Sequence, residues 1–158
     1  PPTFAACGVE EVFHKVKLKP GKPVWFGILR RAAAPPTLVF GLPGNPASSL
    51  VCFELFARPA IRILAGTPRG SWHLPRSRAV LVSSVKGAGD RPVFLPCRLR
   101  NGAGAFEAEP LPWTGSSDLL GMAAASALPG SLPGFIALPA GGNRYEPGDE
   151  VEVVVRAV

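Results

Sequence analysis

Two proline-flanked loops carry the residues best suited to chemistry in this chain. The first, Lys19-Pro20-Gly21-Lys22-Pro23, places two lysines beside one glycine. The second, Gly41-Leu42-Pro43-Gly44-Asn45-Pro46, ends in residue types favoured at the N-cap and the first position of a helix. The free N–H groups at a helix start attract negative charge, and nearby lysines would reinforce that attraction. Together the two loops predict a pocket for an oxyanion.

The elements that must position these loops are a strand before the first and a helix after the second. Alternation predicts a half-buried strand over Val12 to Leu18, with Lys15 and Lys17 on one face. Residues 46 to about 65 predict a helix that Pro59 kinks. Its buried face is expected to comprise five apolar residues at alternating spacings of three and four: Leu50, Phe53, Ala57, Ala60 and Leu64.

Between the loops, short β-rich runs at Val24 to Leu29 and Thr37 to Phe40 predict a hairpin or two neighbouring strands. At the start of the chain, Phe4 to Gly8 is typical of a helix tail followed by its glycine cap. The abrupt opening, Pro1-Pro2-Thr3, predicts that the chain is part of something longer.

The second half of the chain is expected to be mainly β and to form a small barrel or sandwich. Residues 67–74 are rich in Gly, Pro and Ser and predict a linker between domains at 1–66 and 75–158. A short helix is expected over Asp118 to Ala127. Five runs are predicted as strands: Arg78–Val85, Val93–Leu99, Ala105–Glu109, Phe135–Leu138 and Glu150–Arg156.

Composition narrows the class of protein. The 158 residues are 47% hydrophobic, which is ample for a folded core, and no apolar run reaches the ~18 residues of a membrane span. Three scattered cysteines and two isolated histidines predict neither a disulfide framework nor a metal cluster, and they fit a reducing cytosol. The net charge of +6 falls mostly in residues 1–66. Because aromatic residues do not interleave with the basic ones, a small anionic ligand fits better than nucleic acid.

The ordered pair of motifs, Lys19-Pro-Gly-Lys-Pro23 followed by Gly-Leu-Pro-Gly-Asn-Pro46-Ala-Ser48, resembles the molybdopterin molybdotransferase family. That family comprises bacterial molybdenum-insertion enzymes and the E domain of gephyrin. The resemblance extends from about Gly8 to the β-rich tail ending in Glu146-Pro-Gly-Asp-Glu-Val-Glu-Val153. It implies the end of a molybdopterin-binding α/β domain followed by a C-terminal β-barrel-like domain.

The resemblance also implies an activity. The reaction would insert molybdate into the dithiolene of adenylylated molybdopterin and release AMP, with a divalent ion, usually Mg²⁺. It implies a homodimer whose active site is completed across subunits. Composition adds the expectation of a cytoplasmic location, with no membrane and no nucleic-acid partner. The acidic residues expected to handle the ion lie upstream in the family, so residues 1–158 alone are expected to be inactive.

The resemblance and the substitution discussed below give ten expected substrate-binding residues, among them Lys15 and four residues of the second loop. Lys19, Lys22 and Ser48 would hold molybdate or a phosphate, and Ser116 would complete the site from the barrel. The full set is Lys15, Lys19, Lys22, Pro43, Gly44, Asn45, Pro46, Ser48, Arg98 and Ser116.

One departure from the family bears on this site. Pro96 stands where the family usually has an arginine, and a proline side chain cannot bind an anion. Either Arg91 or Arg98 could substitute. Arg98, two residues along on the same strand face, is the preferred candidate.

Several alternatives remain open from the sequence. Asn45 could serve only as a helix cap, and Ser116 could cap the predicted helix that follows it. Trp25, Trp72 and Trp113 are expected to pack rather than to stack on a pterin. For the whole chain, a non-enzymatic anion-binding or scaffold module of the gephyrin type is the alternative to an enzyme, and a basic nucleic-acid binder is a third interpretation.

Overall fold

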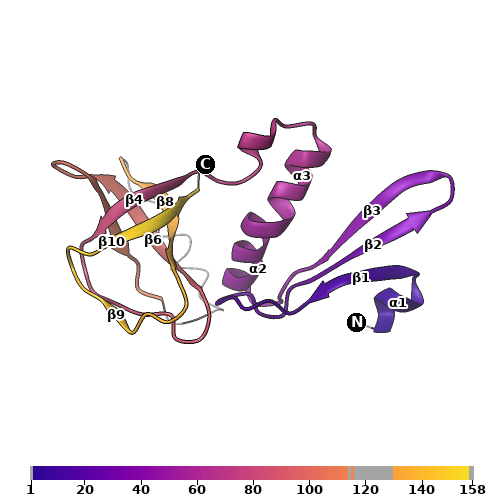
Figure 1. The fold of residues 1–158 in the computed structure, drawn as a ribbon, viewed down its shortest axis with the longest axis horizontal. Coiled ribbons are helices and arrows are strands. Elements are labelled where there is room, and N and C mark those ends of the chain that lie inside the picture. The colour runs from indigo at the N-terminus through magenta and orange to yellow at the C-terminus, as the bar shows by residue number, and fades with distance from the viewer. Residues whose placement is uncertain (1, 114, 116–129, 157–158) are drawn as a thin grey trace.

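A computed structural model describes residues 2–113, 115 and 130–156. The molecule is elongated, with a three-stranded sheet at one end, a small barrel at the other and a helical segment between them (Figure 1). The helix expected over residues 118–127 and the predicted site residue Ser116 lie outside the described residues.

The N-terminal sheet is antiparallel, in the order β1-β2-β3. Its strands are β1 (Val9–His14), β2 (Trp25–Arg31) and β3 (Ala34–Gly41), preceded by the short helix α1 (Pro2–Ala6). Gly8, between α1 and β1, has φ of 76°, the left-handed conformation that suits a glycine just after a helix. The predicted pairing of the second and third strands is confirmed, since Phe26 lies opposite Phe40 in the register.

The strand predicted over residues 12–18 is wrong beyond His14. Lys15 has φ of 66°, a left-handed conformation that turns the chain out of the extended form. Two backbone N–H···O=C bonds of 3.0 Å then close the loop: Lys15 to Val24 and Val16 to Lys22. Lys15 and Lys17 therefore do not share a strand face.

One continuous helical segment follows the second loop, in three parts: α2 (Pro46–Cys52), the π-helix η1 (Phe53–Ala57) and α3 (Arg58–Leu64). Pro59 lacks the N–H that would bond one turn back, and a kink at this residue stays a prediction. The structure has the wider turns of η1 directly before α3, which contains Pro59 near its start. No helix among the described residues is long and apolar enough to cross a membrane.

The buried face of this helix differs from the predicted one. Leu64, predicted to be buried, is 70% exposed. Ala57 is buried as predicted. The other buried residues of the segment are mostly small, and one of them, Cys52, contacts the lysine-loop backbone at Gly21: Ala47, Ser48, Val51, Cys52, Glu54 and Pro59. Spacing identifies large apolar side chains, whereas close approach of backbones selects small ones.

The second half forms a closed barrel in the order β10-β4-β7-β6-β8, which confirms the predicted barrel-like fold. Only β4 and β7 run parallel, and the other neighbouring pairs are antiparallel. The run predicted as one strand at residues 78–85 is divided between β4 and β5, which pairs separately with β9. The bounds are β4 (Arg76–Leu81), β5 (Val85–Lys86), β6 (Val93–Asn101), β7 (Phe106–Pro110), β8 (Leu132–Leu138), β9 (Arg144–Tyr145) and β10 (Glu150–Val155).

Two apolar cores stabilise the chain, and one of them joins its two halves. The first fills the barrel. The second combines side chains from the lysine loop, from α2, from the connecting segment that holds the 3₁₀ turn Arg69–Ser71, and from the barrel: Leu18, Val24, Ala47, Val51, Cys52, Leu74, Phe94, Phe135 and Val154. The barrel therefore packs directly against the elements that carry the two loops.

Candidate functional site

A cavity of about 540 Å³ lies where the two loops meet the barrel. Six of the predicted site residues line it: Lys19, Lys22, Pro43, Gly44, Asn45 and Ser48. The barrel side contributes Arg91, Trp113 and Gly115. The tertiary structure thus brings together side chains that are up to about ninety residues apart in the chain.

The lysine loop is attached to the barrel through its backbone. The Lys19 N–H donates to the Pro92 carbonyl at 3.0 Å, and the Phe94 N–H donates to the Lys19 carbonyl at 2.8 Å. These bonds form an isolated parallel bridge between Lys19 and Val93, at the start of β6. The bridge places Lys19 close to Arg91, which directly precedes that strand.

On its other side the lysine loop packs against α2. The Cys52 thiol lies 3.5 Å from the Gly21 carbonyl and donates to it. Gly21 has φ of 126°, and a Cβ there would come within 2.6 Å of the Cys52 sulfur. Only glycine fits this contact, so the residue between the two lysines determines how closely the loop approaches the helix.

The second loop delivers the start of α2 to the same cavity. Asn45 occupies the N-cap position with extended backbone (φ −73°, ψ 128°), and Pro46 is the first helical residue, as predicted. The Asn45 side chain makes no capping hydrogen bond to the helix. Ser48, in the first turn, is 4% exposed and is one of the residues that line the cavity.

The barrel contributes two N–H donors that lack acceptors within the described part of the chain. They are Arg91 Nε and Trp113 Nε1, both buried. Arg91 was one of the two candidates to replace the missing arginine at position 96, whereas Trp113 was predicted only to pack. The one signal in the sequence for Trp113 as a site residue was its position two residues before Gly115, which also lines the cavity.

Three predicted site residues do not line this cavity: Lys15, Pro46 and Arg98. Arg98 is directed to the neighbouring strand, where its Nη1 lies 3.8 Å from Glu109 Oε2. Its position on the strand face beside Pro96 does not bring it to the loops. A substrate contact by any of these three residues stays a prediction.

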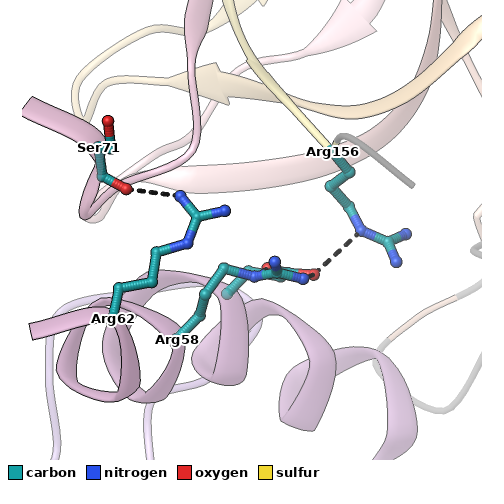
Figure 2. Close-up of polar contacts among 5 residues, drawn as sticks. Arg58, Arg62, Ser71 and Arg156 are labelled. Carbon is teal, nitrogen blue, oxygen red and sulfur yellow. Dashed lines mark hydrogen bonds and ion pairs between the residues drawn. The ribbon is translucent and has the colours of Figure 1, made fainter. Parts of the chain in front are cut away.

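A buried carboxylate fixes the helix against the barrel. Glu54 in η1 is 3% exposed and pairs with Arg58 one turn along, with Arg58 Nη2 at 3.1 Å from Glu54 Oε1. From the end of β10, Arg156 Nε approaches the same oxygen at 3.4 Å. Figure 2 shows Arg156 extending from the barrel to the helix, and Arg62 bonding the carbonyl of Ser71.

The described lining of the cavity is cationic and contains no carboxylate. Within residues 2–113, 115 and 130–156, no group of three or more His, Cys, Asp or Glu side chains could hold a metal ion. The Cys52 thiol beside the loop is no nucleophile either, because burial raises its pKa to about 12. The described lining is therefore suited to binding an anion.

Two protein-family models match the chain. A "Probable molybdopterin binding domain" covers residues 3–63, and the "MoeA C-terminal region (domain IV)" covers residues 78–155. The second match falls on the barrel. The first falls on the sheet and the helical segment.

Known proteins match over nearly the whole chain. The molybdopterin molybdenumtransferases of Synechocystis sp. and Bacillus subtilis are each 31% identical, over 94% and 98% of this chain. A crystal structure of the molybdopterin biosynthesis moeA protein of Pyrococcus horikosii aligns with 99% of it, at a TM-score of 0.72 and 25% identity. The chain spans about a third of the length of these relatives: 32%, 33% and 35%.

Proposed function

Because this chain belongs to the molybdopterin molybdenumtransferase family, we propose that the protein acts in molybdenum cofactor biosynthesis. The reaction we assign is insertion of molybdate into adenylylated molybdopterin, with release of AMP. The observation that supports this proposal is one cavity lined by residues of both motifs. The first loop contributes Lys19 and Lys22, the second contributes Gly44, and Ser48 follows just after it.

The chemistry of the cavity suits this substrate. Molybdate is a tetrahedral dianion, and the dithiolene and phosphates that it meets are also anionic. Their approach requires nearby cations, and Lys19 and Lys22 provide two ammonium groups that act as point charges. The Ser48 hydroxyl can donate one further hydrogen bond. In this proposal these three residues hold and orient the oxyanion and reduce the repulsion between the reactants.

The divalent ion implied by the family does not fit the residues described here. Mg²⁺ prefers carboxylate and other oxygen ligands, and the described lining has two lysines and an arginine but no carboxylate. We therefore assign no step to Mg²⁺ within this part of the protein.

Molybdate binding tests the proposal. Equilibrium dialysis of the protein against molybdate, with molybdenum measured by mass spectrometry, is expected to show saturable binding. Lys22→Ala should weaken it about tenfold or more, because a charge-assisted contact is lost. Lys17→Ala, which removes an exposed lysine outside the cavity, is the matched control. Equal affinity in the Lys22→Ala and Lys17→Ala proteins would contradict the role of Lys22.

A second experiment separates an enzyme from a binding module. The natural protein in which residues 1–158 occur is expressed in bacteria that lack the transferase, and restored molybdoenzyme activity is expected. Molybdate binding without any rescue would instead favour the non-enzymatic, gephyrin-type alternative.

Three features of the whole protein belong to the same proposal. We propose a homodimer, tested by light scattering, and a cytoplasmic location, tested by cell fractionation. We also propose domains at 1–66 and 75–158 joined by residues 67–74, where limited proteolysis should cut first. The exposed, Gly- and Pro-containing turn at residues 66–71 supports this boundary.

A further inference from the structure

The barrel side of the cavity holds two polar groups that its own described residues leave unsatisfied. Arg91 Nε and Trp113 Nε1 are both inaccessible to solvent and have no hydrogen-bond acceptor among the described residues. Buried N–H groups in folded proteins are nearly always paired with protein, water or ligand. Both residues line the same cavity as Lys19 and Lys22.

The charge of Arg91 is only weakly engaged by the protein. Asp90 is the one acid paired with it in the described structure, and Asp90 Oδ1 lies 3.6 Å from Arg91 Nε, beyond hydrogen-bond distance. The Asp90 side chain is 89% exposed, so water screens this pair. The guanidinium remains available to a ligand on the cavity side.

The backbone bridge between Lys19 and β6 fixes where Arg91 lies. The Lys19 backbone bonds to Pro92, the residue directly after Arg91, and to Phe94, the second residue of β6. The cationic side chains of Lys19 and Arg91 therefore belong to two segments held together by main-chain hydrogen bonds. Arg98, by comparison, contacts Glu109 and lies outside the cavity.

We infer that Arg91 and Trp113 form the barrel-side half of the anion site, donating to oxygens of the ligand that the lysines hold from the other side. The inference rests on the proposed function and deepens it: Arg91, rather than Arg98, supplies the arginine that Pro96 cannot. Trp113 contributes one neutral N–H. The ligand is thus a tetrahedral oxyanion group with acceptors facing both walls, either free molybdate or a phosphate of the pterin nucleotide.

Binding of three probes tests this inference. Dialysis against molybdate, inorganic phosphate and AMP is carried out with Arg91→Ala, Arg91→Gln and Trp113→Phe proteins. We expect Arg91→Ala to weaken binding of the probe that the unaltered protein binds most tightly by about tenfold or more. Trp113→Phe should weaken it severalfold, since each substitution removes a hydrogen-bond donor. Arg100→Ala, which removes an exposed arginine from β6, the strand that follows Arg91, should match the unaltered protein within about twofold.

The three probes also identify the source of the oxyanion. A loss confined to molybdate assigns Arg91 to the free metal oxyanion, whereas a loss confined to phosphate and AMP assigns it to the nucleotide. Circular dichroism checks that each variant is folded. Arg91→Lys retains the positive charge, so it should bind more tightly than Arg91→Ala, and it replaces that variant in the test if Arg91→Ala is poorly folded.

The outcomes distinguish this inference from the proposed function. If Lys22→Ala weakens binding and Arg91→Ala, Arg91→Gln and Trp113→Phe all bind as the unaltered protein does, the inference is overturned and the proposed function stands. If the unaltered protein binds none of the three probes, both are overturned.

Discussion

Gly21 is the residue on which the geometry of the lysine loop depends most directly. Its φ of 126° and its distance from Cys52 exclude any side chain, so the loop can approach α2 only with glycine here. Gly44 in the second loop has no atom within 4 Å of a Cβ built on it. Gly21 and Gly44, which both line the cavity, therefore differ in how strictly the structure requires glycine.

Substituting these glycines tests that difference. Gly21→Ala is expected to lower the free energy of unfolding by about 1–3 kcal/mol, through backbone strain and the steric clash with the Cys52 sulfur. Gly44→Ala should change it by less than about 0.5 kcal/mol, as is usual where no contact is altered. Urea unfolding measures both. Equal stabilities for the two variants would show that the loop does not need glycine at position 21.

The cysteines differ sharply in reactivity. Burial raises the pKa of the Cys52 thiol to about 12, and burial likewise raises that of Cys97 to about 12, against a smaller lowering by a hydrogen bond with the Ile136 backbone. Cys7 is exposed. At pH 8, iodoacetamide should therefore add one label to the native protein, at Cys7, and three after denaturation. Mass spectrometry counts the labels, and rapid native labelling of Cys97 would contradict the structure of the barrel core.

The same shifts predict a pH dependence of stability. In the unfolded chain these two thiols ionise near pH 9.0, but in the folded protein they stay protonated until about pH 12. Their contribution to stability is therefore complete below about pH 9 and is lost as the pH rises toward 12.

At the scale of elements, the helical segment joins the sheet to the barrel through one buried acid. Glu54 lies within the π turn and forms ion pairs with Arg58 of the same helical segment and with Arg156 at the end of β10. Figure 2 shows the side chains of these two arginines. Arg156 also lies over the Phe135 ring, with its Cζ 5.7 Å from the ring centroid. The π turn thus places a carboxylate where helix and barrel meet.

Removing this buried acid should lower the free energy of unfolding more than removing an exposed acid does. Glu54→Ala is expected to lower the free energy of unfolding by about 3 kcal/mol, because it leaves two partly buried arginines without their counter-charge. Glu10→Ala, which breaks an exposed pair with Arg30, should cost at most about 1 kcal/mol. Chemical denaturation compares the two, and equal losses would show that Glu54 does not stabilise the contact between helix and barrel.

For the whole molecule, the shared apolar core predicts that the two halves unfold together. The side chains in it come from the lysine loop, α2 and the barrel, so loss of either half exposes the other. Thermal unfolding followed by far-UV circular dichroism and by tryptophan fluorescence should give coincident midpoints. Two separate transitions would show that the barrel and the sheet are independent.

Phe135 tests this coupling with a single substitution. Its side chain is fully buried in the shared core, and Phe135→Ala should lower the free energy of unfolding by about 3–5 kcal/mol while both probes still change together. Phe106→Ala, at a barrel strand where the residue is 39% exposed, should have a small effect.

Local patterns in the sequence were sufficient for most elements. The hairpin, the long helix starting at Pro46, its interruption near Pro59 and the five barrel strands follow from periodicity and turn residues, which act over a few neighbours. The errors occur where distant contacts outweigh these patterns. The first strand stops at His14 because Lys15 and Val16 bond across the loop, and the helix buries small residues because a loop and a barrel pack on it.

By itself the sequence determined the family, the two motif loops and the cationic character of the site, since these depend on residue types and short spacings. Only the tertiary structure decided which residues meet in the cavity: it includes Arg91 and Trp113 and leaves out Lys15 and Arg98. The physical reason is that the barrel closes and packs on α2 through a shared apolar core, and these contacts join residues far apart in the chain, which no short segment specifies.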